Sequence, residues 1–239
     1  LLYASLFIHE PHFMTTLRLI MGDHLTTDIA ALKGADKKND VILMVEVASE
    51  IDPIPHHKQK IVLILSAMRH FANQLKANGY KVDYVELLHE ANSQSFTGEV
   101  KRAVDRHKAK HLVVTEPSEW RVLEEVKSWT KRLGIAITTK IDDRFICSKA
   151  EFSQWASNRK SLRMEYFYRQ MRQATGLLME GRNPVGNLWN YDRENRKSIP
   201  ADTCIPPQKR FAPNETTQNV IALVEQRFPG HFGTVDGFG

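Results

Sequence analysis

The chain has few cysteines, no long apolar run and no glycine-rich phosphate-binding turn. Its two cysteines, Cys147 and Cys204, are too few for a disulfide scaffold or a self-contained zinc or iron–sulfur site, and this usage is typical of cytosolic proteins. No apolar run approaches the ~20 residues that cross a bilayer. Neither GxGxxG nor GxxxxGKS/T occurs. We therefore expect a cytoplasmic chain with no membrane partner, no metal site of its own and no triphosphate site.

The composition that remains is that of a globular protein. Apolar residues make up 42% and charged residues 26% of the 239 residues, which excludes disordered and fibrous classes. The net charge of +5 is uneven, because residues 151–200 hold nine Lys and Arg against five Asp and Glu. A basic surface beside aromatic residues suits an anionic polymer, but a solvated helical face has the same composition. Charge alone leaves both interpretations open.

Short apolar runs alternate with helical patterns over residues 15–145. Five runs are rich in Val, Ile, Leu and Thr, as is typical of strands buried on both faces: 17–21, 41–47, 81–87, 111–115 and 135–139. Between the second and third runs, apolar residues recur at helical spacing from Ile61 to Leu75, and Gly79 closes the helix. This alternation predicts an α/β fold, a doubly wound parallel five-stranded sheet of Rossmann-like type.

The sequence predicts three segments. Residues 1–14 have no features of the domain that follows and are interpreted as a non-native or leader segment. Residues 15–145 form the sheet domain. Residues 146–239 contain helices alone: Ser148 and Glu151 form a capping box, a long helix runs from Met164 to Gly181, and a last short helix spans 219–227.

Several acidic residues follow the predicted strands. Gly22, Asp23 and His24 follow the first, Glu46 lies at the end of the second with Glu50 four residues on, and Glu116 follows the fourth. In doubly wound sheets, ligands bind at the carboxyl ends of the strands. Carboxylates would repel a phosphate but accept hydrogen bonds from hydroxyl or ring N–H groups, so we expect a polyol or heterocycle. For any one of these acids, helix capping or solvent exposure is an alternative.

Longer motifs resemble a known family. They are LIMGDHL at 19–25, HHKQK at 56–60, SAMRHFA at 66–72, SFTGEVKRA at 95–103, TEPSEWRV at 115–122, DDRFICS at 142–148, RKSLRMEYFYRQMRQATGLLMEG at 159–181 and WNYDRENRK at 189–197. In this order they resemble the N-terminal portion of the deoxyribodipyrimidine photolyase-related proteins, the iron–sulfur bacterial cryptochromes and prokaryotic (6-4) photolyases. The resemblance extends from about Thr16 to the last residue.

The resemblance implies an antenna domain and a helical interdomain linker. Members of the family repair ultraviolet-damaged DNA with FAD and a 4Fe–4S cluster in a C-terminal helical domain, which we expect to lie beyond this chain. The chain alone is therefore expected to have no catalytic residues, although the whole protein resembles a DNA lyase. Its implied cofactor is the antenna pigment 6,7-dimethyl-8-ribityllumazine, and the implied pocket residues are Gly22, Asp23, His24, Val45, Glu46, Glu50 and Ile64. Asp23 with Glu46 or Glu50 would anchor the polar groups, and Val45 and Ile64 would flank the ring.

The same resemblance implies a DNA partner for the whole protein, which we expect to be a monomer. The family's interdomain loop corresponds to residues 182–197, and its implied DNA contacts are Arg182, Trp189, Tyr191, Arg193 and Arg196. Two alternatives stay open. A stand-alone nucleotide-binding α/β enzyme would bind ATP, and a vestigial binding module would fold but take up no pigment.

Overall fold

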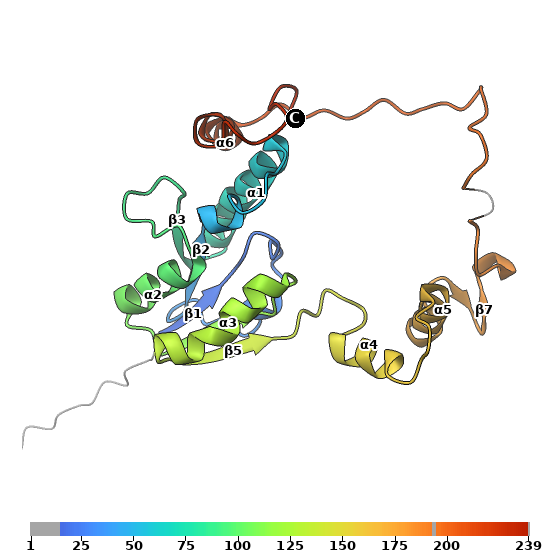
Figure 1. The fold of residues 1–239 in the computed structure, drawn as a ribbon, viewed down its shortest axis with the longest axis horizontal. Helices are drawn as coiled ribbons and strands as arrows, with labels where there is room; N and C mark the ends of the chain where they lie inside the picture. The colour runs from blue at the N-terminus through green and yellow to red at the C-terminus, as the bar shows by residue number, and fades with distance from the viewer. Residues whose placement is uncertain (1–14, 193–194, 239) are drawn as a thin grey trace, which may run out of the picture. The chain divides into compact units, whose positions relative to one another are not determined.

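The structure of the chain is a computed structural model that describes residues 15–192 and 195–238 (Figure 1). The leader or non-native segment predicted for residues 1–14 lies outside the described residues. The chain divides into two compact units. Of the described residues, the sheet unit holds 15–142 and 211–238, and the second unit holds the rest of 143–210.

Five parallel strands form the sheet, in the order β3-β2-β1-β4-β5. The strands are β1 (Thr16–Leu19), β2 (Val41–Val45), β3 (Lys81–Val85), β4 (His111–Thr115) and β5 (Ala136–Lys140). The predicted doubly wound α/β class is confirmed, and the central β1 lies between β2 and β4. The first three strands are shorter than predicted. Residues 20–21, 46–47 and 86–87 follow the strands and lead into the loops at the carboxyl edge, with the amides of Ile20 and Glu46 still bonded to the neighbouring strand.

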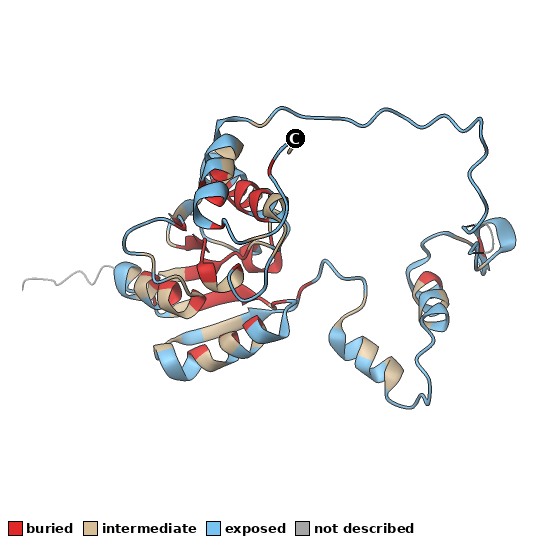
Figure 2. Ribbon diagram, turned by 45° about the horizontal axis from the view of Figure 1, so that its top comes forward, coloured by how far each residue is buried: buried red, intermediate tan, exposed pale blue. Residues whose placement is uncertain are grey.

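Strand side chains alternate between the two faces of the sheet and form two apolar cores (Figure 2). On one face, Ile42 packs in a core with α1 (Lys58–Ala77). On the other, Leu43 packs with α2 (Phe96–His107) and α3 (Trp120–Leu133). The helices therefore cover both faces, and the carboxyl edge of the sheet is left for a site.

The last helix, α6 (Glu215–Arg227), belongs to the sheet unit and lies beside α1 (Figure 1). It begins four residues before the predicted start because the Asn214 side chain accepts a hydrogen bond from the Thr217 amide at 3.1 Å. Its buried Val220 and Val224 join the core of α1. The sequence assigns residues 146–239 to one segment, whereas the structure returns 211–238 to the sheet unit, because this helix has an apolar face that α1 buries.

The second unit contains α4 (Lys149–Ala156), α5 (Met164–Thr175) and the two-residue strands β6 (Met179–Glu180) and β7 (Asn183–Pro184). The predicted Ser148–Glu151 capping box is present at α4, with both of its hydrogen bonds. The prediction of a helix to Gly181 is wrong. Helix α5 ends at Thr175, because Gly176 adopts φ +72° and its amide bonds the Arg172 carbonyl oxygen at 2.8 Å.

Three short 3-10 turns complete the elements: η1 (Ala30–Leu32), η2 (Ala48–Glu50) and η3 (Val185–Asn187). Within the described ranges, no helix combines the length and the apolar character needed to span a bilayer.

Candidate functional site

A cavity of about 380 Å³ lies at the carboxyl edge of the sheet. It is lined by the loops after β1, β2 and β4 and by one side of α1, which is where the strand order predicts a ligand. Six of the seven sequence-predicted pocket residues line it: Gly22, Asp23, Val45, Glu46, Glu50 and Ile64. The volume lies within the range of small-molecule sites, roughly 300–1,000 Å³.

One wall of the cavity is apolar. Helix α1 contributes four aliphatic or thioether side chains, and β2, α2 and α3 contribute one each: Ile61, Ile64, Leu65, Met68, Val45, Phe96 and Val122. Ile61, Leu65 and Met68 follow the helical spacing that also packs α1 on the sheet. Ile64 is 36% exposed, so its side chain is free to contact a ligand. This wall suits the face of a ring.

Gly22 allows the loop after β1 to lie against this wall. A Cβ at this position would lie 3.1 Å from Ile64 Cγ2 and 3.2 Å from Met68 Sδ, closer than ordinary van der Waals contact. The loop and α1 therefore approach as closely as they do because residue 22 has no side chain.

We expect Gly22→Ala to lower the free energy of unfolding by about 1–3 kcal/mol, because the stiff, β-branched Ile64 must move. Urea unfolding followed by circular dichroism measures the change. The matched control is Gly230→Ala, where a Cβ meets nothing within 4 Å and which should change stability by less than about 0.5 kcal/mol. Equal effects of the two substitutions would mean that the close approach at Gly22 is not required.

Glu46, at the end of β2, is 1% exposed, and its carboxylate is held by four donors. Arg69 Nε bonds Oε1 at 2.7 Å and Arg69 Nη2 bonds Oε2 at 3.0 Å, a bidentate pair. The Tyr84 hydroxyl donates to Oε1 at 2.6 Å, and the Leu87 amide donates to Oε2 at 2.8 Å. Glu46 therefore joins α1 to β3, and its prediction as a polar anchor for a ligand needs correction. Most of the hydrogen-bonding capacity of its carboxylate is already used inside the protein.

The Glu46 cluster also shifts the pKa values of its partners. The hydrogen bonds to Glu46 raise the pKa of Arg69 above its ordinary value. Burial, followed by the negative charge of Glu46, raises the pKa of Tyr84, so the phenol keeps its proton and stays a donor. The arginine charge balances the buried carboxylate, as such a group requires.

Glu50, in η2, contacts the N-terminal end of α3. Its Oε1 accepts a hydrogen bond from Arg121 Nη2 at 2.7 Å, and the same guanidinium bonds Glu119 through Nε at 2.9 Å. Burial raises the pKa of Glu50, and Arg121 partly opposes this shift. Arg121 thus connects the loop after β2 to the loop after β4 across the cavity edge. Unlike Glu46, Glu50 keeps a partly exposed carboxylate beside the cavity.

The raised pKa of Glu50 predicts a pH dependence of stability. The folded chain keeps this proton to a higher pH than the unfolded chain, in which the carboxyl has its ordinary pKa of about 4.5. The contribution of Glu50 to the free energy of unfolding therefore falls as pH rises from that value through the raised pKa. Thermal unfolding between about pH 4 and pH 7 should show this fall in the wild type but not in Glu50→Gln. Glu90→Gln, at an exposed position outside the cavity, should keep the wild-type slope; an unchanged slope in Glu50→Gln would contradict the assignment.

Asp23 and His24 are adjacent in the loop after β1 but differ in their exposure to solvent. Asp23 lines the cavity with its side chain 54% exposed. His24 is fully buried and is not among the lining residues, so its predicted place in the pocket needs correction. The His24 amide bonds the Met21 carbonyl oxygen at 3.0 Å, and this tight turn leaves Asp23 outside and His24 inside. The His24 Nε2 atom lies 3.5 Å from Asp23 Oδ1.

The carboxyl edge of the sheet carries less net negative charge than the sequence indicates. Four carboxylates line the cavity and three cations line it or bond to these carboxylates, which leaves a net charge of −1: Asp23, Glu46, Glu50 and Glu119 against Lys60, Arg69 and Arg121. The cavity therefore repels a phosphate less than its acids alone would. The chain still has no glycine-rich turn that could bind one.

Sequence reasoning missed Arg69, Tyr84 and Arg121. A signal for Arg69 was present, because it lies four residues after Leu65 and three before Ala72, on the apolar side of α1. A cation on a buried helix face needs a carboxylate partner. Arg121 gave no such signal, because its pairing with Glu50 depends on the fold alone.

The predicted DNA contacts lie in the second unit. Arg182, Tyr191 and Arg196 are exposed, and Arg193 lies outside the described residues. Trp189 is half-buried, with the guanidinium groups of Arg169 and Arg172 at 5.4 and 5.3 Å from its ring centroid. Its aromatic surface is therefore engaged within the unit, so a free stacking role for Trp189 is not what the structure shows.

The fold and site define a class, a doubly wound α/β domain with a small-molecule cavity at the carboxyl ends of its strands. A family profile described as deoxyribodipyrimidine photo-lyase-related protein matches residues 18–239, and the chain belongs to this family. The resemblance stated from the motifs is thereby confirmed.

Two relatives show how much of the chain is shared. The chain is 49% identical over 226 residues to a protein of Agrobacterium fabrum named (6-4) photolyase, which covers 95% of this chain and 45% of that protein. It is also 22% identical over 149 residues to an uncharacterized protein of Acanthamoeba polyphaga mimivirus, over 59% of this chain and 71% of that protein. The chain thus spans about half the length of the photolyase that it matches.

Proposed function

We propose that this chain is the antenna part of a photolyase-like DNA-repair protein and that its cavity holds 6,7-dimethyl-8-ribityllumazine. When bound, this pigment would absorb violet-to-blue light and transfer excitation to a flavin elsewhere in the protein. The cavity has an apolar wall on one side and carboxylates on the other, and this division is the observation that carries the proposal. A ring system with a polyhydroxyl tail has the same division into an apolar and a polar part.

The lining residues fit such a group. Ile64 and Met68 would lie against the ring, and Phe96 extends the same apolar wall. At the polar side, Glu50 and Glu119 can accept hydrogen bonds from hydroxyl groups, and Asp23 offers a further, exposed carboxylate. Glu46 would act indirectly, because it fixes α1 against β3 and so holds the apolar wall in place.

A titration of the purified chain with the pigment tests the proposal, with fluorescence anisotropy as the readout. A ligand of roughly 23 non-hydrogen atoms at about −0.3 kcal/mol per atom gives a Kd of about 10 µM. Saturable binding in this range supports the antenna assignment. Binding of ATP without pigment binding would favour a nucleotide-binding enzyme, and an intact fold that binds neither would favour a vestigial module.

For the whole protein, we further propose DNA as a partner and residues 143–210 as a contact surface. This segment holds thirteen Lys and Arg against seven Asp and Glu, a net charge of +6, so the rest of the chain has a net charge of −1. Arg182 and Arg196 are exposed and form no ion pair among the described residues, so their charges are free for phosphate. Such contacts position a duplex and carry no sequence information.

Duplex binding by the full-length protein tests this surface. We expect Arg182→Ala with Arg196→Ala to weaken binding at low salt and to reduce the slope of log K against log salt by about 2. Lys127→Ala is the control, because Lys127 lies in the sheet unit and already pairs with Glu124 at 2.6 Å. An unchanged slope in the double variant would exclude these two arginines as phosphate contacts.

The whole protein is expected to hold two further cofactors. FAD and a 4Fe–4S cluster would belong to the half of the protein beyond this chain. In the described portion, no group of three or more His, Cys, Asp or Glu is arranged to hold a metal ion. Cys147 and Cys204 are free thiols, which supports a reducing, cytoplasmic location. We expect the whole protein to be a monomer.

A further inference from the structure

The second unit has almost no apolar interior of its own. Among its described residues, Arg172 and Pro184 alone are buried. The sheet unit, by contrast, contains two large cores of buried apolar residues (Figure 2). Helix α4 buries no residue, and α5 buries Arg172 alone. A segment of 68 residues needs a core or a covering partner to hold its helices in place.

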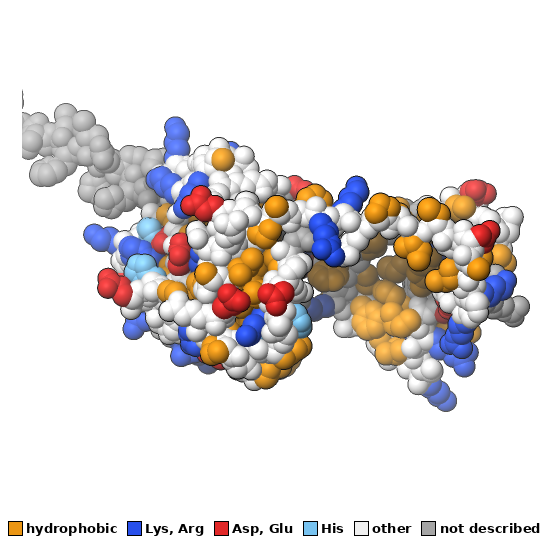
Figure 3. Space-filling view, turned by 90° about the horizontal axis from the view of Figure 1, so that it is seen from above, with side chains coloured by type: hydrophobic (Ala, Val, Ile, Leu, Met, Phe, Trp, Pro, Cys, Tyr) orange, Lys and Arg blue, Asp and Glu red, His pale blue; other side chains and the backbone are white. Residues whose placement is uncertain are grey.

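Its apolar side chains instead lie open on the surface (Figure 3). Thirteen of the large hydrophobic residues that are exposed in the described chain belong to this unit, from Phe145 at its start to Ile205 near its end. Single exposed apolar residues are ordinary, but so many along one short segment indicate a surface that is covered in the whole protein.

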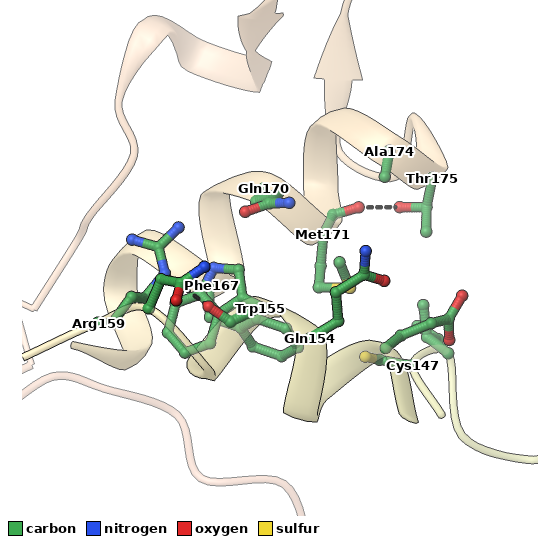
Figure 4. Close-up of a pocket in the computed structure, with 12 residues that line it drawn as sticks. Cys147, Gln154, Trp155, Arg159, Phe167, Gln170, Met171, Ala174 and Thr175 are labelled. Carbon is green, nitrogen blue, oxygen red and sulfur yellow. Dashed lines mark hydrogen bonds between the residues drawn. The ribbon is translucent and has the colours of Figure 1, made fainter. Parts of the chain in front are cut away.

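The most developed part of this surface is a hollow of about 680 Å³ between α4 and α5 (Figure 4). Trp155 of α4 and Phe167 of α5 contact each other with ring centroids 4.9 Å apart, and Phe152 lies 5.2 Å from Phe167. The hollow is extended by Ile146, which is 67% exposed, and by Met171. This aromatic cluster connects the two helices. Beside it lies a depression lined by aromatic and aliphatic side chains together with uncharged polar ones such as Gln154, Asn158 and Gln170.

The charge of the hollow distinguishes it from the proposed DNA surface. Of its twelve lining residues, Glu151 and Arg159 alone are ionised, and their charges cancel. Arg159 is further engaged with Trp155, through a hydrogen bond to its carbonyl oxygen and a guanidinium 4.4 Å from its ring centroid. A neutral, aromatic depression suits protein side chains better than a phosphate backbone.

The extent of the exposed surface favours a large partner within the same polypeptide. The (6-4) photolyase that the chain matches is more than twice as long as the matched region, which covers 45% of it. A second copy of this chain would cover one patch, whereas the exposed apolar residues extend along the whole of 143–210. We propose that the α4–α5 hollow and its flanking apolar residues are the docking surface for the half of the full-length protein beyond this chain. The inference rests on the part of the proposed function that gives the protein such a half.

Hydrogen–deuterium exchange of this chain alone and of the full-length protein tests the proposal, without pigment, light or DNA. In the full-length protein, amides of α4 and α5 should exchange at least about 100-fold more slowly than in this chain alone. Amides of α1 and β4, in the sheet unit, should exchange equally in both proteins. The readout involves neither the cavity nor the basic loop, so its failure is distinguishable from failure of the antenna or DNA assignments.

A pair of variants of the full-length protein sharpens the test. Trp155→Ala with Phe167→Ala should restore fast exchange in α4 and α5 and also loosen amides of the second half. Trp120→Ala, at a tryptophan that is 71% exposed in the sheet unit, should change neither. Equal exchange of α4 and α5 in both proteins would overturn the proposal, whether they are protected or unprotected. Protection that requires added duplex would assign the surface to DNA, and protection that rises with protein concentration would assign it to a second copy.

Discussion

Glu46→Ala is expected to lower the free energy of unfolding by about 3–5 kcal/mol, the cost of removing one partner of a buried ion pair. The substitution leaves the Arg69 guanidinium, whose side chain is 13% exposed, without its bidentate acceptor. It also removes the acceptor of the Tyr84 hydroxyl and of the Leu87 amide. Chemical denaturation followed by far-ultraviolet circular dichroism measures the loss.

Two further variants separate the structural role of Glu46 from ligand binding. Asp23→Ala removes an exposed carboxylate of the same cavity, which lies 3.5 Å from His24 Nε2, and should cost no more than about 1 kcal/mol. Tyr84→Phe removes one of the four donors and should cost about 0.5–1.5 kcal/mol. If Glu46→Ala were as stable as Asp23→Ala, the carboxylate would not be the structural link that its contacts indicate.

The sheet and the position of the site could be predicted because both depend on local patterns. Runs such as 111–115 are short and rich in β-branched residues, and β4 has those bounds in the structure. The strand order then places the loops after β1, β2 and β4 together, so the carboxyl edge could be identified without any side-chain geometry.

The roles of the individual carboxylates could not be predicted in the same way. Glu46 and Arg69 are 23 residues apart, and their pairing depends on how α1 crosses the sheet. Glu50 and Arg121 are 71 residues apart and meet only because β1 lies between β2 and β4. A carboxylate that follows a strand can bind a ligand or a neighbouring cation, and the sequence alone does not distinguish the two. For the same reason, the sequence did not predict that α6 belongs to the sheet unit, because its packing against α1 is a tertiary contact.

The apolar wall of the cavity is tested by filling it with a larger side chain. Ile64→Trp should abolish pigment binding, because an indole at this position occupies the cavity beside Met68 and Gly22. Ile64 is 36% exposed, so the larger side chain need not enter the core, but it meets the loop at Gly22 and should lower the free energy of unfolding by about 1–3 kcal/mol, which leaves the chain folded. The pigment titration and a urea unfolding curve on the same preparation measure the two effects.

Leu63→Trp is the matched control for the filled cavity. Leu63 is the preceding residue of α1, is 59% exposed and does not line the cavity, so the same indole there should leave both affinity and stability unchanged. If both variants lost binding, the loss would come from a change in α1 itself rather than from filling of the cavity. If Ile64→Trp still bound the pigment as tightly as the wild type, the ring would have to bind elsewhere. The division of this cavity into an apolar and a polar side would then no longer support an antenna function.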